Sequence, residues 1–213
     1  MSVFETLRAA GDPEKARQMA AYMRDQFPFL GVPTPVRRAL TGEFLRTAGK
    51  QVDWSFVRQC WEQPEREFQY VGVDYLNRRR GTLGAADVPN VRELIVTKSW
   101  WDTVDGLDMV VGDIALRHPD VAGTLLAWSR DDNMWLRRVA IDHQLQRKSR
   151  TDTGLLETIL VNNLGQGEFF IQKAIGWSLR DFSKTDPEWV RGFLARYRDR
   201  LAPLSVREAS KYL

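Results

Sequence analysis

A short segment with two adjacent tryptophans and two aspartates contains the first residues suited to chemistry. It reads KSWWDTVD over residues 98–105, so Trp100 and Trp101 are followed by Asp102 and Asp105. Neighbouring residues on a helix diverge by about 100°, so the two rings cannot both enter one core, and one of them faces a groove or a partner. The two carboxylates, three residues apart, can share a helical face. The ordinary alternative is that the rings pack and the acids favour the helix N-terminus.

A second group of residues combines an aromatic ring with cations. Trp177 and Arg180 are three residues apart, which places an indole beside a guanidinium on one helix face. This pair is either an ordinary surface contact or one side of a site for a flat charged group. Arg137 and Arg138 point to different faces of their helix, so at least one of them is expected on the binding side. The three arginines at residues 78–80 are typical of a solvated helix end, with contact to phosphate as the alternative.

Several kinds of catalytic site have no support in the sequence. The two histidines, His118 and His143, lie far apart and have no cysteine partner, which argues against a metal site. The sequence contains no phosphate-binding glycine loop and no nucleophile motif. Cys60 falls on the apolar face of a helical pattern and is predicted to be structural. We therefore expect no metal and no cofactor, and metal-assisted hydrolysis, nucleotide hydrolysis and acyl transfer are poorly supported.

The elements that must position these residues are predicted to be helices. Apolar residues recur at three- and four-residue spacing in nine segments, which are residues 16–27, 56–61, 68–76, 110–116, 121–128, 135–145, 155–164, 169–182 and 190–197. Helix starts are marked by a cap-like residue before proline, at Asp12-Pro13, His118-Pro119 and Asp186-Pro187. Breaks are expected at Pro64 and Pro89, and a loop between Gly81 and Gly84. No stretch shows sustained strand alternation, so the sequence predicts an all-α fold.

An internal repeat organises these helices. An anchor residue is followed five positions later by a small residue and, in most units, five positions later again by an apolar one. The anchors are Trp101, Trp135, Phe169 and Leu204, at separations of 34, 34 and 35 residues. A further unit begins near Phe68. Five units of this length, each able to hold two helices, predict a stacked α-helical solenoid, which normally binds something extended.

The repeat also predicts which residues share a surface. Counted from the anchor of each unit at about 100° per residue, Asp105, Arg138, Trp177 and Arg180 fall within about 140° of arc. Trp101 lies in the same sector, and the small residues lie outside it. Acidic, aromatic and cationic side chains from different units are therefore expected to line one face.

Composition sets outer limits on these interpretations. The 213 residues are 43% hydrophobic and 28% charged, which indicates a folded chain, and we expect residues 1–213 to form one domain. There is no membrane-spanning apolar run or secretory signal, and a single cysteine fits a reducing cytoplasm. The net charge of +3 is too small to indicate nucleic acid. The 24 arginines among 31 basic residues, with eight tryptophans, suit phosphate and ring contacts, although a GC-rich genome also raises arginine.

Three stretches together carry a resemblance to a known family. They are LIVTKSWWDTVD at residues 94–105, FFIQKAIGW at 169–177 followed by Leu179 and Arg180, and LAPLS at 201–205 followed by Arg207-Glu-Ala. Shorter supporting stretches are PEKA at 13–16, PEREF at 64–68 and GDI at 112–114. In these motifs the sequence resembles the AlkD family of DNA alkylation-repair glycosylases, over nearly the whole chain.

The resemblance implies a fold and a set of site residues. The fold is a right-handed superhelical solenoid of HEAT-like antiparallel helix pairs, whose concave face binds DNA. The family's site residues match six positions of this sequence: Asp105 as the catalytic acid, Trp101 and Trp177 as the site tryptophans, Arg138 and Arg180 as phosphate contacts, and Tyr22 as an aromatic residue near the lesion.

The resemblance also implies a function. The expected activity is a monofunctional, hydrolytic DNA glycosylase that excises cationic alkylated purines, of the 3-methyladenine and 7-methylguanine type, from duplex DNA in base excision repair. No lysine accompanies the matched site residues, so no Schiff base is expected. The alternative is a non-catalytic HEAT-like module that binds DNA, branched DNA or a protein. We expect a cytoplasmic monomer associated with DNA, and weaker non-specific DNA affinity because the sequence ends at Leu213 without the basic tail of some relatives.

Overall fold

The computed structural model describes residues 2–213, and every regular element in that range is a helix. The all-α fold class predicted from the sequence is therefore confirmed. The described residues divide after Leu83 into two compact units, each considered by itself below. Nothing in this division tests the expectation of one domain over residues 1–213, which stays a prediction. No helix of residues 2–213 combines the length and the apolar composition that a membrane span requires.

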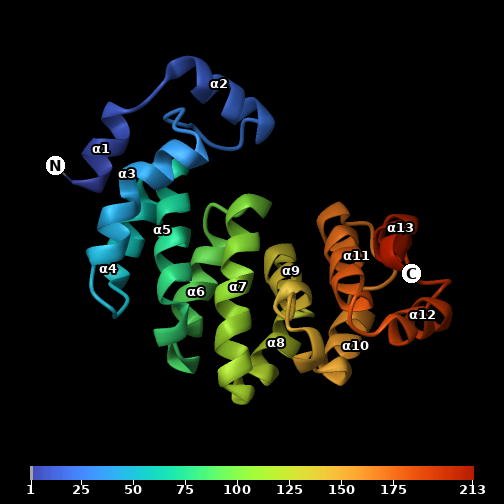
Figure 1. Cartoon of the computed structure of the whole chain (residues 1–213). Coiled ribbons are helices and arrows are strands. Elements are labelled where there is room, and N and C mark those ends of the chain that lie inside the picture. The colour runs from blue at the N-terminus through green and yellow to red at the C-terminus, as the bar shows by residue number, and fades with distance from the viewer. Residues whose placement is uncertain (1) are drawn as a thin grey trace. The chain divides into compact units, whose positions relative to one another are not determined.

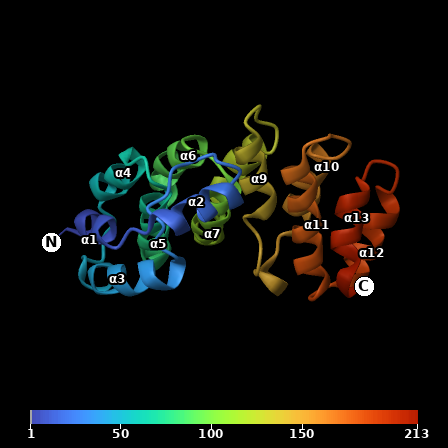
Figure 2. The same cartoon turned by 90° about the horizontal axis from the view of Figure 1, so that it is seen from above.

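Unit 1 contains five α-helices. They are α1 (Val3–Ala9), α2 (Pro13–Tyr22), α3 (Thr34–Thr47), α4 (Trp54–Glu62) and α5 (Arg66–Arg79), followed by the short 3-10 helix η1 (Arg80–Thr82). Helix α3 packs against α1 and α5, and α4 packs against α5, as Figure 2 shows. Helix α2 buries none of its own residues. Its position therefore depends on the loop that follows it.

That loop, between α2 and α3, is held by one buried carboxylate. The backbone N–H groups of Leu30, Gly31 and Val32 all donate to Glu67 of α5, at 2.8–3.0 Å, and Glu67 is fully buried. Gly31 adopts a φ of +83°, and a Cβ there would lie 2.0 Å from the carbonyl oxygen of Asp12, so only glycine fits. Glu67 thus ties the segment that carries α2 to the core of unit 1.

Unit 2 contains eight α-helices and the remaining 3-10 helices. The α-helices are α6 (Val88–Val96), α7 (Trp101–Arg117), α8 (Ala122–Trp128), α9 (Met134–Asp142), α10 (Thr153–Asn162), α11 (Phe169–Ser183), α12 (Pro187–Arg196) and α13 (Pro203–Ala209). The 3-10 helices are η2 (Ala85–Asp87), η3 (Pro119–Val121), η4 (Lys148–Arg150) and η5 (Ser210–Tyr212).

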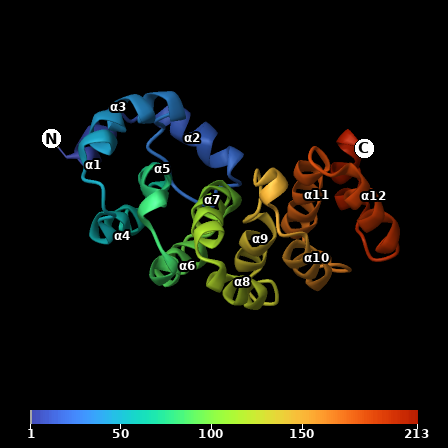
Figure 3. The same ribbon diagram turned by 60° about the horizontal axis from the view of Figure 1, so that its bottom comes forward.

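The helices of unit 2 stack in two layers, as the repeat predicts. Helices α7, α9, α11 and α13 pack against one another in that order, and Figure 1 shows α7, α9 and α11 side by side. Figure 3 shows α6, α8 and α10 as the second layer. The anchors Trp101, Trp135, Phe169 and Leu204 all fall in the first two residues of the helices of the first layer. The superhelical twist of the whole chain and its concave DNA-binding face stay predictions.

Polar caps and close backbone contacts fix the ends of several helices. The side chains of Asp12 and Asp186 accept hydrogen bonds from backbone N–H groups of the first turn of α2 and α12, which confirms both predicted starts. Gly112 of α7 lies against the chain just after α9, because a Cβ there would approach the carbonyl oxygen of His143 to 2.3 Å. Cys60 is fully buried in α4, as predicted.

Some predicted elements differ from the observed ones. Helix α2 ends at Tyr22 rather than at residue 27, because Arg24 and Asp25 adopt positive φ angles of 56° and 55°. The sequence patterns missed α1, α3 and α6. Pro89, interpreted as a break, lies in the first turn of α6, where proline needs no N–H partner.

Arg79 needs a correction, because the run of three arginines at residues 78–80 is not simply a solvated helix end. Its guanidinium is buried and donates to the carbonyl oxygens of Gly49 at 3.0 Å, Leu45 at 3.2 Å and Ala48. These carbonyls lie at the end of α3 and just beyond it. Arg79 therefore satisfies the last carbonyls of that helix, a role that sequence spacing cannot indicate.

Candidate active site

A bidentate ion pair between α7 and α9 forms the centre of the site. Arg138 donates from Nε to Oδ1 of Asp105 at 2.7 Å and from Nη2 to Oδ2 at 2.8 Å. Its third nitrogen, Nη1, donates to the carbonyl oxygen of Phe170 at 2.7 Å. The Arg138 side chain is only 2% exposed, whereas that of Asp105 is 26% exposed. A buried guanidinium thus presents the Asp105 carboxylate toward the surface with both oxygens fixed.

The two predicted site tryptophans, Trp101 and Trp177, are both half-buried. In the sequence, Trp101 precedes the ion pair and Trp177 follows it. Trp101 is one helical turn before Asp105 on α7, so the two side chains share a face. Trp177 comes from α11, and its ring centroid lies 5.4 Å from the guanidinium carbon of Arg138. Arg138 therefore connects the carboxylate of α7 with the indole of α11.

Two further cations lie close to the Trp177 ring. Nζ of Lys173 is 5.5 Å from the ring centroid, and the guanidinium carbon of Arg180 is 5.9 Å from it. Both cations are held by Glu208 of α13, to which Lys173 donates at 3.0 Å and Arg180 at 2.9 Å. Lys211 donates to the same carboxylate at 2.7 Å. Three cations around one carboxylate leave this edge of the site positively charged.

The environment of Glu208 shifts its titration strongly. The hydrogen bond from Lys211, followed by that from Lys173, lowers the pKa of Glu208 to about 2. Glu208 is therefore ionised throughout the neutral range. The presence of Lys173 corrects the expectation that no lysine accompanies the site, although its amino group is ion-paired.

An aromatic cluster supports the ion pair from within unit 2. Trp100 contacts Trp135 and Phe170 at centroid distances of 5.8 and 5.2 Å, and Trp135 contacts Phe170 at 5.1 Å. Of the two adjacent tryptophans, Trp100 therefore packs into this cluster, while Trp101 shares the helical face of Asp105. The cluster fixes Phe170, whose carbonyl oxygen accepts the hydrogen bond from Arg138.

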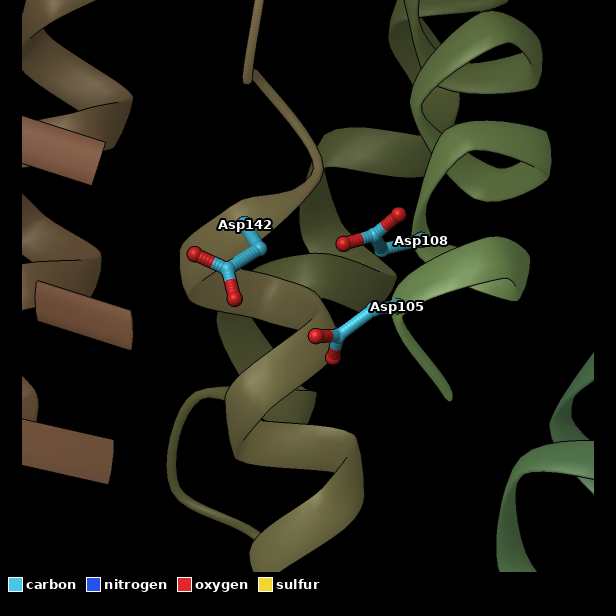
Figure 4. A group of neighbouring side chains, drawn as sticks. All are labelled: Asp105, Asp108 and Asp142. Atoms are coloured by element: carbon cyan, nitrogen blue, oxygen red, sulfur yellow. The ribbon is translucent and has the colours of Figure 1, made fainter. Parts of the chain in front are cut away.

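Two buried aspartates lie next to the ion pair, as Figure 4 shows. Asp108 of α7 and Asp142 of α9 are 4% and 2% exposed, and one oxygen each of Asp105, Asp108 and Asp142 lie within 4.8 Å of one another. Among residues 2–213, this is the one group of acids close enough to share a metal ion. The group already contains the guanidinium of Arg138, whose Nη2 lies 3.7 Å from Oδ2 of Asp142.

The pKa values in this group depart from their ordinary range. Burial raises the pKa of Asp142 to about 7, although the positive charge of Arg138 opposes the shift. Burial, followed by the charges of Asp142 and Asp105, raises the pKa of Asp108 well above its usual value. Burial acts to lower the pKa of Arg138, but the surrounding carboxylates of Asp142 and Asp105 raise it overall. Arg138 is therefore always charged.

Of the six predicted site residues, unit 2 contains five. Arg138 is hydrogen-bonded to Asp105 and close to Trp177, Arg180 is close to the same ring, and Trp101 shares the face of Asp105 on α7. The sixth, Tyr22, lies at the end of α2 in unit 1 and is 73% exposed. Its position relative to the others stays a prediction.

The structure also adds residues that the sequence did not predict as part of the site. They are Asp108, Asp142, Lys173, Glu208, Lys211, Trp135 and Phe170. Three of them lie at helical spacing from a predicted site residue, which the sequence does show. Asp108 follows Asp105 by three residues, Asp142 follows Arg138 by four, and Lys173 precedes Trp177 by four.

Comparison with known proteins identifies the family. The sequence matches the family described as "DNA alkylation repair enzyme" over residues 3–213. A solved structure, described as a predicted DNA alkylation repair enzyme from Enterococcus faecalis, is similar with a TM-score of 0.88 and 36% sequence identity. The similarity covers 95% of this chain and 96% of that chain. No curated protein matches the sequence.

The chain belongs to the DNA alkylation repair enzyme family. Membership of this family supports an enzymatic role in the repair of alkylated DNA, with DNA as the partner. The family match includes the complete site segment of α7, α9, α11 and α13 described above. The similarity to a solved structure also agrees with the all-α fold class predicted from the sequence.

Proposed function

We propose that this DNA alkylation repair enzyme is a glycosylase that hydrolyses the N-glycosidic bond of cationic alkylated purines, such as 3-methyladenine and 7-methylguanine, in duplex DNA. The observation that carries the proposal is the Asp105 carboxylate, which a buried Arg138 holds at the surface beside half-buried aromatic rings. A fixed negative charge next to aromatic faces suits a cationic reacting group.

The chemistry follows from the charge of the substrate. A purine alkylated at N3 or N7 carries a positive charge, and it becomes neutral when its glycosidic nitrogen takes the electron pair of the breaking bond. A strong general acid is therefore less important than stabilisation of the positive charge that develops on the sugar. The Asp105 carboxylate stabilises that charge and orients a water molecule. The water adds its oxygen to C1′ and loses a proton, which balances the reaction.

Other residues of the site bind and orient the DNA in this proposal. Trp101 and Trp177 exclude bulk water and hold the sugar and the backbone near Asp105. Arg180, whose side chain is 28% exposed, contacts a phosphate of the DNA backbone. Lys173, whose side chain is 26% exposed, adds a second positive charge beside that phosphate. Arg138 has little exposed surface, so its main role is to orient Asp105, and a phosphate contact is limited to its exposed edge. The family resemblance implies that Tyr22 supplies an aromatic ring near the lesion.

We further propose that the enzyme is monofunctional. The only lysine near the Trp177 ring among residues 2–213 is Lys173, and Glu208 holds its ammonium group. A protonated, ion-paired lysine is a poor nucleophile for Schiff-base formation. Borohydride added during turnover should therefore trap no covalent protein–DNA complex. The enzyme is expected to act as a monomer in the cytoplasm, where its DNA substrate is found.

Incubation of the protein with methylated duplex DNA tests the proposed activity. Chromatography and mass spectrometry of the small-molecule fraction should show free 7-methylguanine and 3-methyladenine, and abasic sites should appear in the duplex. The Asp105→Asn variant serves as the matched control for contaminating activity. Binding of duplex without release of any base would favour the alternative, a non-catalytic module that binds DNA.

A further inference from the structure

The buried side of the Arg138–Asp105 pair carries more negative charge than its cation can balance. Asp105, Asp108 and Asp142 supply three carboxylates, and Arg138 supplies one guanidinium. Figure 4 shows Asp105 and Asp108 extending from α7 toward Asp142 on α9. With all three ionised, the group has a charge of −2, and two of its acids are almost completely removed from water. An uncompensated buried charge is unstable and is normally removed by protonation.

Asp142 is the least compensated member of this group. Neither of its carboxylate oxygens has a hydrogen-bond partner among residues 2–213. Its nearest cation, Nη2 of Arg138, is 3.7 Å away and already donates to Asp105 at 2.8 Å. A carboxylate in this position lacks the hydrogen bonds that would stabilise its ionised form.

Other charged groups of the helices around α9 are directed elsewhere. Asp113 pairs with Arg117 within α7, and Glu157 of α10 pairs with Arg196. On α6, Arg92 pairs with Asp131 and Glu93 is exposed. On α11, Lys173 and Arg180 pair with Glu208, and Asp181 accepts a hydrogen bond from the backbone N–H of Gln146. The charged groups that act on Asp142 are Arg138 on its own helix and Asp105 and Asp108 on α7.

We propose that the Asp108–Asp142 pair holds a proton at neutral pH and thereby keeps Arg138 directed at Asp105, so that both aspartates are positioning residues for base excision. This role rests on the proposed glycosylase function, whereas the protonation itself does not. With the proton present, the pair carries one negative charge less beside Arg138, which donates to Asp105 alone of the three carboxylates. Without it, Asp142 competes for the same Nη2 and draws the guanidinium away from the catalytic carboxylate.

The protonation has a consequence for stability that needs no activity measurement. The pKa of Asp142 is raised from 3.8 to about 7 by burial, so the folded chain binds this proton more tightly than the unfolded chain. The ionisation of Asp142 therefore lowers the free energy of unfolding as pH rises from about 4 to about 7, and this loss is constant above that range. An asparagine at this position does not ionise and avoids this loss.

Thermal unfolding between about pH 4 and about pH 8 tests the pair. The melting temperature of Asp142→Asn relative to wild type should rise through this range and level off near neutrality. Asp132→Asn, an exposed change just before α9, is the matched control and should follow wild type. Parallel curves for wild type and Asp142→Asn would overturn the proposal. It would equally be overturned if a divalent cation, added as Mg²⁺ or Mn²⁺, raised the melting temperature of wild type and left Asp142→Asn unchanged.

Infrared spectroscopy gives a second measurement on the wild-type protein, which does not depend on the folding of any variant. A protonated-carboxyl band should be present at about pH 6 and should weaken as pH rises past about 7. The absence of this band at pH 6 would exclude a proton on the pair.

The pH dependence of excision tests the positioning role. Wild-type single-turnover excision should fall several-fold as pH rises through the neutral range, and this fall should be absent in Asp142→Asn. Asp142→Ala, which leaves a hole beside Arg138, should be slower than Asp142→Asn at every pH. A wild type that releases no base at any pH contradicts the proposed function alone, because unfolding and infrared measurements still decide the protonation. An identical pH profile in wild type and Asp142→Asn contradicts the positioning role.

Discussion

Arg138 and Asp105 form a two-point contact between consecutive helices of one layer, in which the cation is buried and the anion is partly exposed. The donor distances of 2.7 and 2.8 Å fix the plane of the carboxylate as well as its position. A surface ion pair held by two flexible side chains gains little from such contact. Here the guanidinium is also held by the carbonyl oxygen of Phe170, so the orientation of Asp105 is set before any substrate binds.

Replacement of Asp105 by asparagine should remove excision and leave DNA binding largely intact. The amide keeps the size of the side chain but loses the negative charge that stabilises the developing cation. We expect single-turnover release of 7-methylguanine to fall by about two orders of magnitude or more. Duplex affinity measured by fluorescence anisotropy should stay close to that of wild type. Near-normal release by the variant would contradict a catalytic role for Asp105.

The two arginines of the site should respond differently to substitution. Arg138→Gln removes the group that orients Asp105, so excision should fall by about 10- to 100-fold with little change in the salt dependence of duplex binding. Arg180→Gln removes a partly exposed cation, so binding to damaged and undamaged duplex should weaken alike, with a salt slope lower by about one.

Titrations of undamaged duplex over a range of salt concentrations provide the measurement for both variants. Arg191→Gln is a suitable control, because this exposed arginine pairs with Glu188 of its own helix α12 rather than with a site residue. A lower salt slope for Arg138→Gln would show that Arg138 itself reaches a phosphate, as the family resemblance implies.

Glu208 should make stability depend on acid pH. Its folded pKa of about 2 lies below its ordinary value of 4.5, so its contribution is present above pH 4.5 and is lost as pH falls toward 2. Glu208→Gln should therefore lower the free energy of unfolding by about 1–3 kcal/mol at neutral pH. In urea titrations, the difference from wild type should shrink at about pH 3. A difference that is the same at both pH values would show that the charge of Glu208 is unimportant.

Glu67 should determine the order of α2 in unit 1. Glu67→Ala leaves the N–H groups of residues 30–32 without their buried acceptor, at a cost of about 3 kcal/mol or more. Because α2 has no buried residue of its own, its backbone amides should exchange faster with deuterium. Glu62→Ala, an exposed change in α4, provides the control. Unchanged exchange in α2 would mean that another contact holds this helix.

The sequence predicted the central part of the site because that part follows a repeat. Asp105, Arg138 and Trp177 occupy successive helices of one layer, and their offsets from the repeat anchors place them in one sector of those helices. Helical periodicity identified most of α4 to α12 for the same reason, since one apolar face of each helix is buried. Helices α1, α3 and α6 escaped detection. Helix α2 was found but extended too far, because the turn after Tyr22 depends on backbone angles at two non-glycine residues.

The residues that sequence reasoning missed depend on contacts between distant segments. Glu208 acts through the packing of α13 against α11, which no local pattern specifies. Asp108 and Asp142 lie at helical spacing from predicted residues, yet acids are expected to be exposed, and nothing in their spacing indicates that both are buried. Arg79 was likewise expected to be exposed, because charged side chains usually are, and nothing in its spacing indicates that it is buried.

The aromatic cluster of Trp100, Trp135 and Phe170 gives the site an optical reporter of its own. Two indoles of this cluster support the residue that holds Arg138, and a third, Trp177, lies close to the same guanidinium. Indole emission changes with local charge and exposure to solvent. Replacement of the tryptophans at positions 54, 61, 128 and 189 by phenylalanine would leave the site indoles, together with Trp101, as the source of the signal. Duplex binding could then be followed by intrinsic fluorescence, without any label on the DNA or the protein.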